Sequence, residues 1–240
     1  MENNIKKIVI KSNKSRVVTF EDFCGFENVT ITVQKDAKLN LRLASFNKTQ
    51  NVQLKVILKE NASSDMVYAD FSDDSISFRA LIKLEGEYSN ASWKLSSLSK
   101  KEENKNFDIS FIHEAKNTIS NMENYGVGMD NSKLVFKGVS HILNGSSNSN
   151  AIQQAKIIVF DDGVDASSSP SLRIDENDVN ASHAAIVGRL NEEHLYYLMS
   201  RGLSEDEARK LITYGYLSPI AQYFDLKTQE EIMNKIKSRL

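Results

Sequence analysis

Histidine and cysteine are the side chains of this 240-residue chain that could hold a soft metal or move a proton near neutral pH. The most informative of them is His183, in the segment Ser182-His183-Ala184-Ala185, which follows a stretch rich in Asp and Asn. Imidazole is a competent iron ligand, so His183 is a candidate metal ligand. Taken alone, the residues favour a plainer interpretation, an imidazole held by hydrogen bonds at the end of a strand.

Three carboxylates shortly before this histidine could bind a hard cation if their oxygens converged. They are Asp175, Glu176 and Asp178. In an extended strand Glu176 and Asp178 would share one face and Asp175 would point to the other. A solvated polar turn is therefore the favoured interpretation.

The remaining donors are isolated along the sequence. His113 and His141 have no neighbour at metal-ligand spacing, and His194 falls in the first turn of an expected helix, at the surface. Cys24 lies between aromatic residues in the segment 23–26, where a single cysteine is more often a small buried hydrophobe than a ligand.

Composition excludes several classes of protein. Thirty Lys and Arg against 32 Asp and Glu give a formal charge of −2, which argues against a general binder of nucleic acid or anionic membranes. The first residues lack the apolar core of a signal peptide, and no apolar run reaches the ~20 residues of a membrane helix. A single cysteine cannot form an intrachain disulfide, so we expect a cytoplasmic protein.

From Ile5 to about Ile186 the apolar residues alternate with polar ones, and no helical stretch is expected between them. This pattern predicts many short strands and excludes a doubly wound α/β fold. With only 10 Gly and 2 Pro in the chain, Asn, Asp and Ser must form the turns. Clear examples of the alternation are Val29-Ile31-Val33, Leu39-Leu41-Leu43, Val52-Leu54-Val56-Leu58 and Phe107-Ile109-Phe111.

A sandwich, a barrel and a β-solenoid all fit this spacing. The similar intervals between strands and the scarcity of Asn-Gly and Asp-Gly hairpin dipeptides favour the solenoid. Internal sequence repeats are too weak to establish coils on their own.

The hydrophobic period changes at Asn191, so we expect a solenoid core over residues 1–189 and a helical domain over 190–240. Asn191 is the expected cap of a helix that stops at Gly202. Ser204-x-x-Glu207 is a capping box for a second helix that ends at Gly215. The side chains expected to be buried there are Ala208, Leu211 and Ile212.

Two further starts are expected after it. Ser218-Pro219 is typical of a cap followed by proline at the first helical position. Thr228-x-x-Glu231 is expected to open the last helix, with Ile232, Met233, Ile236 and Leu240 on its apolar face.

A colinear set of motifs resembles the SufB/SufD family, the scaffolds of SUF-system iron–sulfur cluster assembly. The likeness extends over about residues 125–219, and its order and spacing are closer to SufD than to SufB. The motifs are Leu134–Val139, Asn150–Gln154 running into Ile157–Asp162, Pro170-x-Leu172-x-Ile174, Asp178-Val179, Ser182-His183-x-Ala185 and Leu190–Gly202.

The resemblance implies a mostly β protein, a right-handed parallel β-helix with a small C-terminal α-helical domain. It implies a non-catalytic scaffold that pairs with a SufB-type subunit, or with a second copy of itself, through its C-terminal coils. The helical tail, with Leu203–Tyr223 as the expected surface, would dock a SufC-type ATPase. The chain would be a short member without the family's N-terminal helical region. The expected partner-binding residues are Tyr196, Tyr197, Arg201, Leu211, Tyr214 and Tyr216.

In the SufD branch the histidine equivalent to His183 is implicated where the nascent cluster sits, at the interface with SufB. This chain departs from the family in two places. Its segment Asp165–Ser169 has no cysteine where SufB carries one, and Ala181 stands where SufD proteins often carry one. Because clusters prefer thiolates, we expect no cofactor bound stably by this chain alone. A transient iron–sulfur cluster at a subunit interface would need ligands from the partner.

Two other classes remain open. A structural homodimeric SUF-like adaptor without a cluster role is consistent with the missing cysteines. A polysaccharide-active β-helix enzyme would need clustered carboxylates and usually an export signal, and Trp93 is the single Trp available for stacking on sugars. The sequence has no Walker A motif and no Cys-x-x-Cys, so we expect the chain to supply neither nucleotide binding nor sulfur mobilisation on its own, and the resemblance implies that it is not an enzyme.

Overall fold

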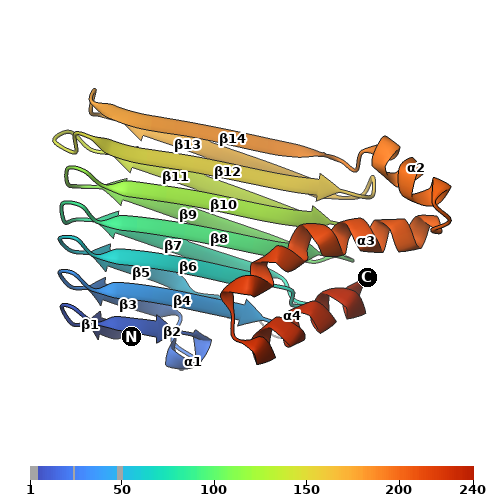
Figure 1. The fold of residues 1–240 in the computed structure, drawn as a ribbon, viewed down its shortest axis with the longest axis horizontal. Helices are drawn as coiled ribbons and strands as arrows, with labels where there is room; N and C mark the ends of the chain where they lie inside the picture. The colour runs from blue at the N-terminus through green and yellow to red at the C-terminus, as the bar shows by residue number, and fades with distance from the viewer. Residues whose placement is uncertain (1–4, 24, 48–50) are drawn as a thin grey trace.

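The chain winds into a parallel β-solenoid, which confirms the predicted fold class (Figure 1). The computed structural model describes residues 5–23, 25–47 and 51–240. Successive strands alternate between two seven-stranded sheets, so that each coil adds one strand to each sheet. Neighbouring strands within each sheet run parallel.

We call the two sheets the odd sheet and the even sheet after their strand numbers. The odd sheet contains β1 (Ile5–Ile10), β3 (Asn28–Val33), β5 (Gln53–Leu58), β7 (Ile76–Leu84), β9 (Asn104–His113), β11 (Lys133–Ile142) and β13 (Asp165–Ile174). The even sheet contains β2 (Ser15–Val18), β4 (Lys38–Ser45), β6 (Ser63–Asp70), β8 (Asn90–Ser99), β10 (Ile119–Gly128), β12 (Ser149–Val159) and β14 (Val179–Arg189).

Alternating side chains fill the space between the sheets, as the period of two predicts. Phe78, Phe107 and Phe136 occupy equivalent positions on adjacent strands of the odd sheet. Trp93 from the even sheet stacks on Phe78, with ring centroids 5.7 Å apart. Each such fully buried ring contributes about 1.5–3 kcal/mol to the free energy of folding, so this aromatic layer is a main source of cohesion between the sheets.

One corner of the solenoid is turned by residues with positive φ, usually Asn or Asp, in successive coils. Asn61 and Asn117, with φ of 55° and 58°, each donate their backbone N–H to a carbonyl of the next coil. Their side chains also form rungs between coils, for example from Asn61 to Asp36 (2.6 Å) and from Asn148 to Asn117 (2.5 Å). Asn and Asp thus perform the role that glycine usually has in tight turns, as the composition predicted.

The interior becomes smaller and more polar toward the last coil. Phe136 of β11 is followed at the same position of β13 by Ser168, and Ala155 of β12 is followed by Ala185 of β14. With such small side chains between them, β13 and β14 pack directly against each other. The solenoid therefore tapers to a thin edge at this end.

The helices follow β14. They are α2 (Glu192–Ser200), α3 (Glu205–Leu217), the 3-10 helix η1 (Ser218–Tyr223) and α4 (Leu226–Arg239). The predicted cap Asn191 accepts the backbone N–H of Glu193, and the capping box of Ser204 and Glu207 is present. Gly202 follows α2 with a φ of 95°, as a helix stop requires.

Several details of the helical prediction are wrong. Helix α3 passes through Gly215 to the buried Leu217 and runs directly into η1, so that Ser218 makes no side-chain cap. The cap of the last helix lies three residues earlier than expected, because Asp225 rather than Thr228 accepts the first backbone N–H. Leu211 is exposed, since α3 turns Ala208 and Leu217 toward the solenoid.

A one-turn helix, α1 (Phe20–Phe23), also interrupts the region predicted to lack helices. It follows the short strand β2, and its Phe23 is fully buried in the core. The sequence segment is too short to show a helical period, which is why the pattern missed it.

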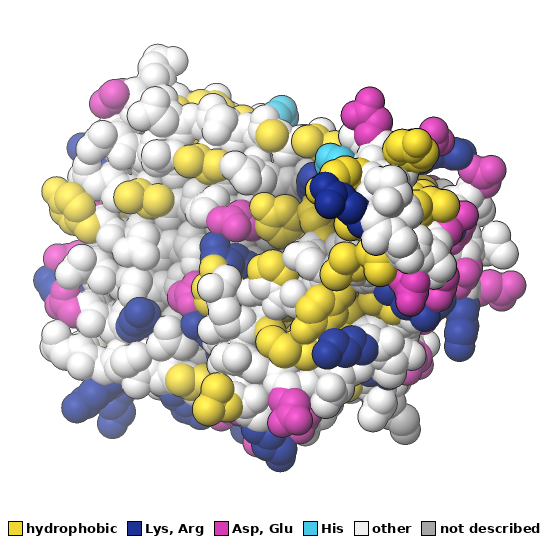
Figure 2. All heavy atoms as spheres, turned by 45° about the vertical axis from the view of Figure 1, so that its right-hand side comes forward, with side chains coloured by type: hydrophobic (Ala, Val, Ile, Leu, Met, Phe, Trp, Pro, Cys, Tyr) yellow, Lys and Arg dark blue, Asp and Glu magenta, His cyan; other side chains and the backbone are white. Residues whose placement is uncertain are grey.

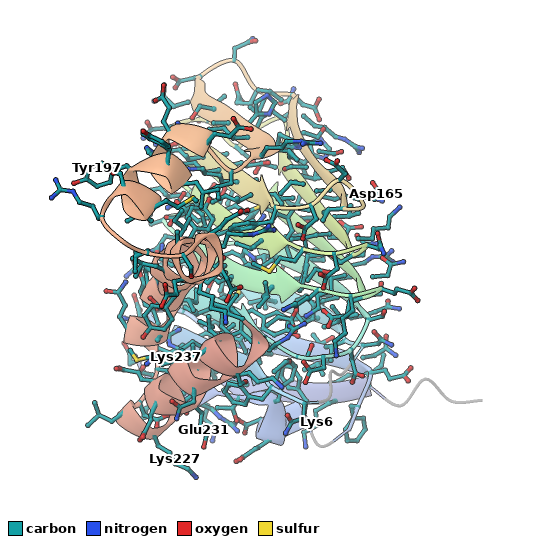
Figure 3. All side chains as sticks on the ribbon, turned by 90° about the vertical axis from the view of Figure 1, so that its right-hand side faces the viewer. Lys6, Asp165, Tyr197, Lys227, Glu231 and Lys237 are labelled. Atoms are coloured by element: carbon teal, nitrogen blue, oxygen red, sulfur yellow. The ribbon has the colours of Figure 1, made fainter. Side chains whose placement is uncertain are left out.

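The C-terminal helices cover part of the outer face of the even sheet. Leu217, Ile220 and Ile232 pack there on Val67 and Val127 in a second hydrophobic cluster. Figure 3 shows the helices on one side of the molecule and the odd sheet on the other, with no described helix over it. None of the helices in the described ranges is long and apolar enough to cross a membrane.

Candidate functional site

The last coil is an open end of the solenoid. Its strands β13 and β14 are the terminal members of their sheets, so each has one edge that no other described strand pairs. Every residue from Asn180 to Val187 is exposed. An unpaired edge offers a row of backbone N–H and C=O groups to another strand.

His183 lies on β14 in this open coil. It is in register with the buried Gln153 of β12, so its position continues a column that points into the solenoid interior. Because no coil follows, the side chain is exposed, and it makes no hydrogen bond to the described residues. The imidazole is therefore free to accept a ligand or a partner group.

Gln153 lies one coil beneath His183 and links the two sheets. Its amide nitrogen donates to the Ser140 hydroxyl (2.7 Å) and to the Ser171 carbonyl (3.1 Å). Its amide oxygen is buried without a partner among the described atoms, beside Gly138, whose missing side chain leaves it room. The sequence signal for this residue is a glutamine at an inward position of a predicted strand, which the sequence analysis did not single out.

The carboxylates near His183 do not converge. Asp175 lies 2.7 Å from the Nε2 atom of His141, whereas Glu176 accepts the backbone N–H groups of Gly145 (3.0 Å) and Asn177 (2.9 Å). Those backbone hydrogen bonds lower the pKa of Glu176. The described residues contain no group of three or more His, Cys, Asp or Glu that could hold a metal ion. The solvated turn is the correct interpretation.

The other single donors have structural or surface positions. His113 is fully buried, with Nδ1 2.7 Å from the Thr118 hydroxyl and Nε2 2.9 Å from that of Ser120, and burial lowers its pKa to about 4. His194 is exposed on α2. Cys24 lies outside the described residues.

The predicted partner-binding residues divide into two groups. Tyr196, Tyr197 and Leu211 are 75%, 56% and 51% exposed, and the Arg201 guanidinium lies over the Tyr197 ring, 5.2 Å from its centroid. Hydrophobic side chains gather on this helical part of the surface in Figure 2. The exposed rings have the composition typical of interface anchors.

Tyr214 and Tyr216 instead help to hold α3 on the solenoid. Tyr216 packs edge to face on Tyr125 of β10 at 5.5 Å, and the Lys156 ammonium lies 5.2 Å above its ring. Burial raises the pKa of its hydroxyl. Tyr214 is half-buried beneath Lys237. The first group is therefore the accessible part of the predicted surface.

Buried charged side chains anchor the last helix to the solenoid. Arg239 of α4 forms an ion pair with Glu103, whose second oxygen lies 3.7 Å from the Lys105 ammonium. Lys105 in turn pairs with Asp70 at 2.8 Å, and both are fully buried. Lys100 donates to the Arg239 carbonyl (2.8 Å), so the end of α4 is fixed at both its side chain and its backbone.

Comparison with known proteins identifies this architecture. The family profile described as "SUF system FeS cluster assembly, SufBD core domain" matches residues 2–216. The iron–sulfur cluster assembly protein SufD of Bacillus subtilis is 34% identical over 140 residues, which are 58% of this chain and 32% of the relative.

Two further relatives match more of the chain at lower identity. A SufBD family protein of Staphylococcus saprophyticus is 24% identical over 214 residues, 87% of this chain and 46% of its own length. One of Mycobacterium tuberculosis is 23% identical over 217 residues, 88% of this chain and 25% of its own length. The chain thus spans between a quarter and about half of these curated relatives. The predicted resemblance is confirmed.

Proposed function

Because the chain belongs to the SufBD core family of SUF-system iron–sulfur cluster assembly proteins, we propose that it is a non-catalytic, SufD-like scaffold subunit of a cytoplasmic assembly complex. In this proposal it pairs with a SufB-type subunit and binds a SufC-type ATPase. The single observation that supports the proposal most strongly is the open last coil. It presents two strand edges that no described strand pairs, and a His183 side chain without a hydrogen bond to the described residues.

The open coil is the proposed site of subunit pairing. A second solenoid end could extend either sheet by backbone hydrogen bonds, and this contact would also cover Ile186 and Val187, which are 58% and 41% exposed. Covering both edges would remove a surface that otherwise favours uncontrolled association.

His183 would then lie between the two subunits. Its imidazole can supply one ligand to an iron–sulfur cluster that is the cargo of the complex, and the thiolates would come from the partner. Gln153 beneath it bonds to both β11 and β13, which fixes the coil on which His183 is placed.

The exposed group on α2 and α3 is the proposed surface for the ATPase. The buried pair of Arg239 and Glu103 ties the end of the helical segment to the solenoid. Movement of the helices by a bound ATPase would thus be transmitted to the scaffold.

Co-expression with SufB-type and SufC-type subunits, followed by native mass spectrometry, tests this function. We expect one complex that contains all three chains. The Ile186→Asp variant should lose the SufB-type subunit, because it places a charge in the proposed contact. The matched control is Ile119→Asp. Ile119 is exposed to a similar degree (52%) and lies on β10 of the same sheet, so this variant should assemble normally.

The homodimeric adaptor is the second candidate, and the absence of cysteine from Asp165–Ser169 and from position Ala181 favours it. A homodimer that binds neither the SufB-type nor the SufC-type subunit would establish the adaptor function and refute the scaffold assignment. If the three-chain complex forms, a His183→Ala variant that still supports full cluster formation would remove the cluster role and leave the pairing role.

A further inference from the structure

The outer face of the odd sheet carries an excess of positive charge, although the formal net charge of the whole chain is slightly negative. Its outward positions alternate with the buried ones on the strands up to β11 and continue in register onto β13. Three cations there are already paired: Arg79 with Asp108 (3.6 Å), Lys83 with Glu114 and Lys133 with Asp165 (both 2.6 Å). Asp108 and Asp165 are the only carboxylates at the outward positions of these described strands.

Four further cations on this face have no ion pair or hydrogen bond from their side chains to any described residue. They are Lys7 on β1, Lys55 on β5, Lys137 on β11 and Arg173 on β13. Lys55 is half-buried and the other three are exposed. This uncompensated charge occurs in a chain whose net charge is −2.

The register places these cations across the whole sheet. Lys7 and Lys55 lie in one row, separated by Thr30 of β3 and therefore about 10 Å apart. Lys137 lies in the row of Arg79 and Asp108. From β1 to β13 the face extends over about 29 Å, six strand spacings, which is wide enough for a protein interface.

The side chains between the cations define the class of partner. Ile57, Leu81, Ile112 and Val139 are half-buried outward residues, and the remaining positions are mostly Ser, Thr and Asn. The outward positions of these described strands hold no Phe, Tyr or Trp. Stacking of single-stranded nucleic acid uses aromatic side chains, and anchoring in a membrane interface uses large apolar ones, so this face is less suited to either ligand than to a folded protein.

We propose that the outer face of the odd sheet is a docking surface for a folded protein with an acidic, fairly flat surface. The four unpaired cations supply the complementary charge, and both carboxylates of the face are already engaged by neighbouring cations, which reduces repulsion. The aliphatic residues supply apolar contact area. This partner would bind the outer face of the odd sheet, whereas the function proposed above uses the strand edges of the last coil and the C-terminal helices. Of the four cations only Arg173 lies on a strand of the open coil, so the inference does not depend on that function.

A charge-reversal variant tests the proposal: Lys7→Glu, Lys55→Glu, Lys137→Glu and Arg173→Glu together. Its matched control reverses four exposed lysines outside this face, Lys11, Lys14, Lys38 and Lys116, and so has the same net charge. Fluorescein-labelled poly-L-glutamate is the acidic probe. We expect the face variant to bind it at least about tenfold more weakly at low salt and the control to bind as the parent does.

Equal loss in the two variants, or no binding by the parent chain, overturns the proposal. Phosphatidylserine-containing vesicles and a single-stranded oligouridine are offered in parallel, and tighter binding of either through the same four residues also overturns it in favour of a membrane or RNA. Thermal unfolding establishes that each variant is folded. If the fourfold variant is not, Lys55→Glu with Lys137→Glu is compared with Lys11→Glu with Lys38→Glu.

Discussion

The buried imidazole of His113 makes the stability of the solenoid depend on pH. Its pKa in the folded chain is about 4, against 6.5 for an exposed histidine. Below pH 6.5 the histidine is protonated in the unfolded chain but stays neutral in the folded chain. The contribution of His113 to the free energy of unfolding is therefore complete above pH 6.5 and is lost as the pH falls toward 4. The difference corresponds to about 3 kcal/mol.

We expect urea unfolding to show this loss between neutral pH and about pH 4, and to show a smaller one in the His113→Gln variant. The variant keeps hydrogen-bonding capacity toward Thr118 and Ser120 but has no group that titrates there. Parallel pH profiles for the two proteins would contradict the assignment.

Tyr88 is the residue that breaks the pattern of Asn and Asp at the turning corner. It has a φ of 60° between Asn61 and Asn117 of the adjacent coils, and its side chain is 58% exposed. A tyrosine in this left-handed region is strained by about 1 kcal/mol relative to asparagine. Tyr88→Asn should therefore raise the free energy of unfolding by about that amount, measured in urea, whereas Tyr88→Phe should leave it unchanged.

What the sequence could predict at this scale depended on distance along the chain. Asn191 and Ser204 bond to backbone groups two and three residues away, so their caps follow from local spacing. Gln153 and His113 have their roles because of side chains in other strands, and the register that brings these together is set by the stacking of whole coils. The same limit explains why the sequence could not predict which groups the carboxylates near His183 contact, such as His141 for Asp175.

At the scale of elements, α4 stays on the solenoid through Arg239 as well as through its apolar face. Arg239→Met would leave Glu103 buried without its main counter-ion, which costs about 3 kcal/mol or more. We expect lower unfolding free energy and faster backbone hydrogen exchange in α4. Lys227→Met is the control on the same helix, since its side chain is 86% exposed and its pair with Glu231 is loose (3.9 Å).

The double variant Arg239→Met with Glu103→Gln separates charge from packing. Removing the carboxylate charge should restore part of the lost stability, because the neutral amide is less costly to bury than an unpaired carboxylate. A double variant as unstable as Arg239→Met alone would assign the loss to packing of the arginine stem.

The helical elements also show where periodicity misleads. The apolar pattern located α3 and its cap correctly, yet it placed Leu211 inside and ended the helix at Gly215. Which stripe of a helix is buried depends on the surface it meets, here Val67, Val127 and their neighbours on the even sheet. That surface is formed by residues far earlier in the chain, so the helix's own sequence does not determine the choice.

For the whole molecule, strand alternation was enough to predict a β-rich chain, and the motif resemblance selected the solenoid. The assignment of faces and ends was not predictable, because it requires the order in which coils stack. The stacking gives a solenoid with one sheet partly covered by the C-terminal helices, a second, basic sheet on which no described helix packs, and a tapered open end. Separate surfaces are thus available to separate partners, and a change at one should leave the others intact.

Leu211→Asp tests this separation at the proposed ATPase surface. Leu211 is exposed on α3 and does not belong to the hydrophobic cluster between the helices and the even sheet, as far as the described residues show. Its replacement should therefore leave folding intact. Burying a leucine at an interface contributes about 1.5–3 kcal/mol, so we expect the Kd for a SufC-type ATPase, measured by titration calorimetry, to rise about tenfold or more. Pairing with a SufB-type subunit should not change.

The matched control is Leu226→Asp, which exchanges the same residue types at an 84% exposed position on α4, outside the predicted docking segment Leu203–Tyr223. It should bind the ATPase like the parent chain. Equal weakening by both variants would show that any added charge on the helices is harmful. Unchanged binding in both would place the ATPase on another surface, while the pairing of the open coil, which depends on β13 and β14, would remain to be judged on its own result.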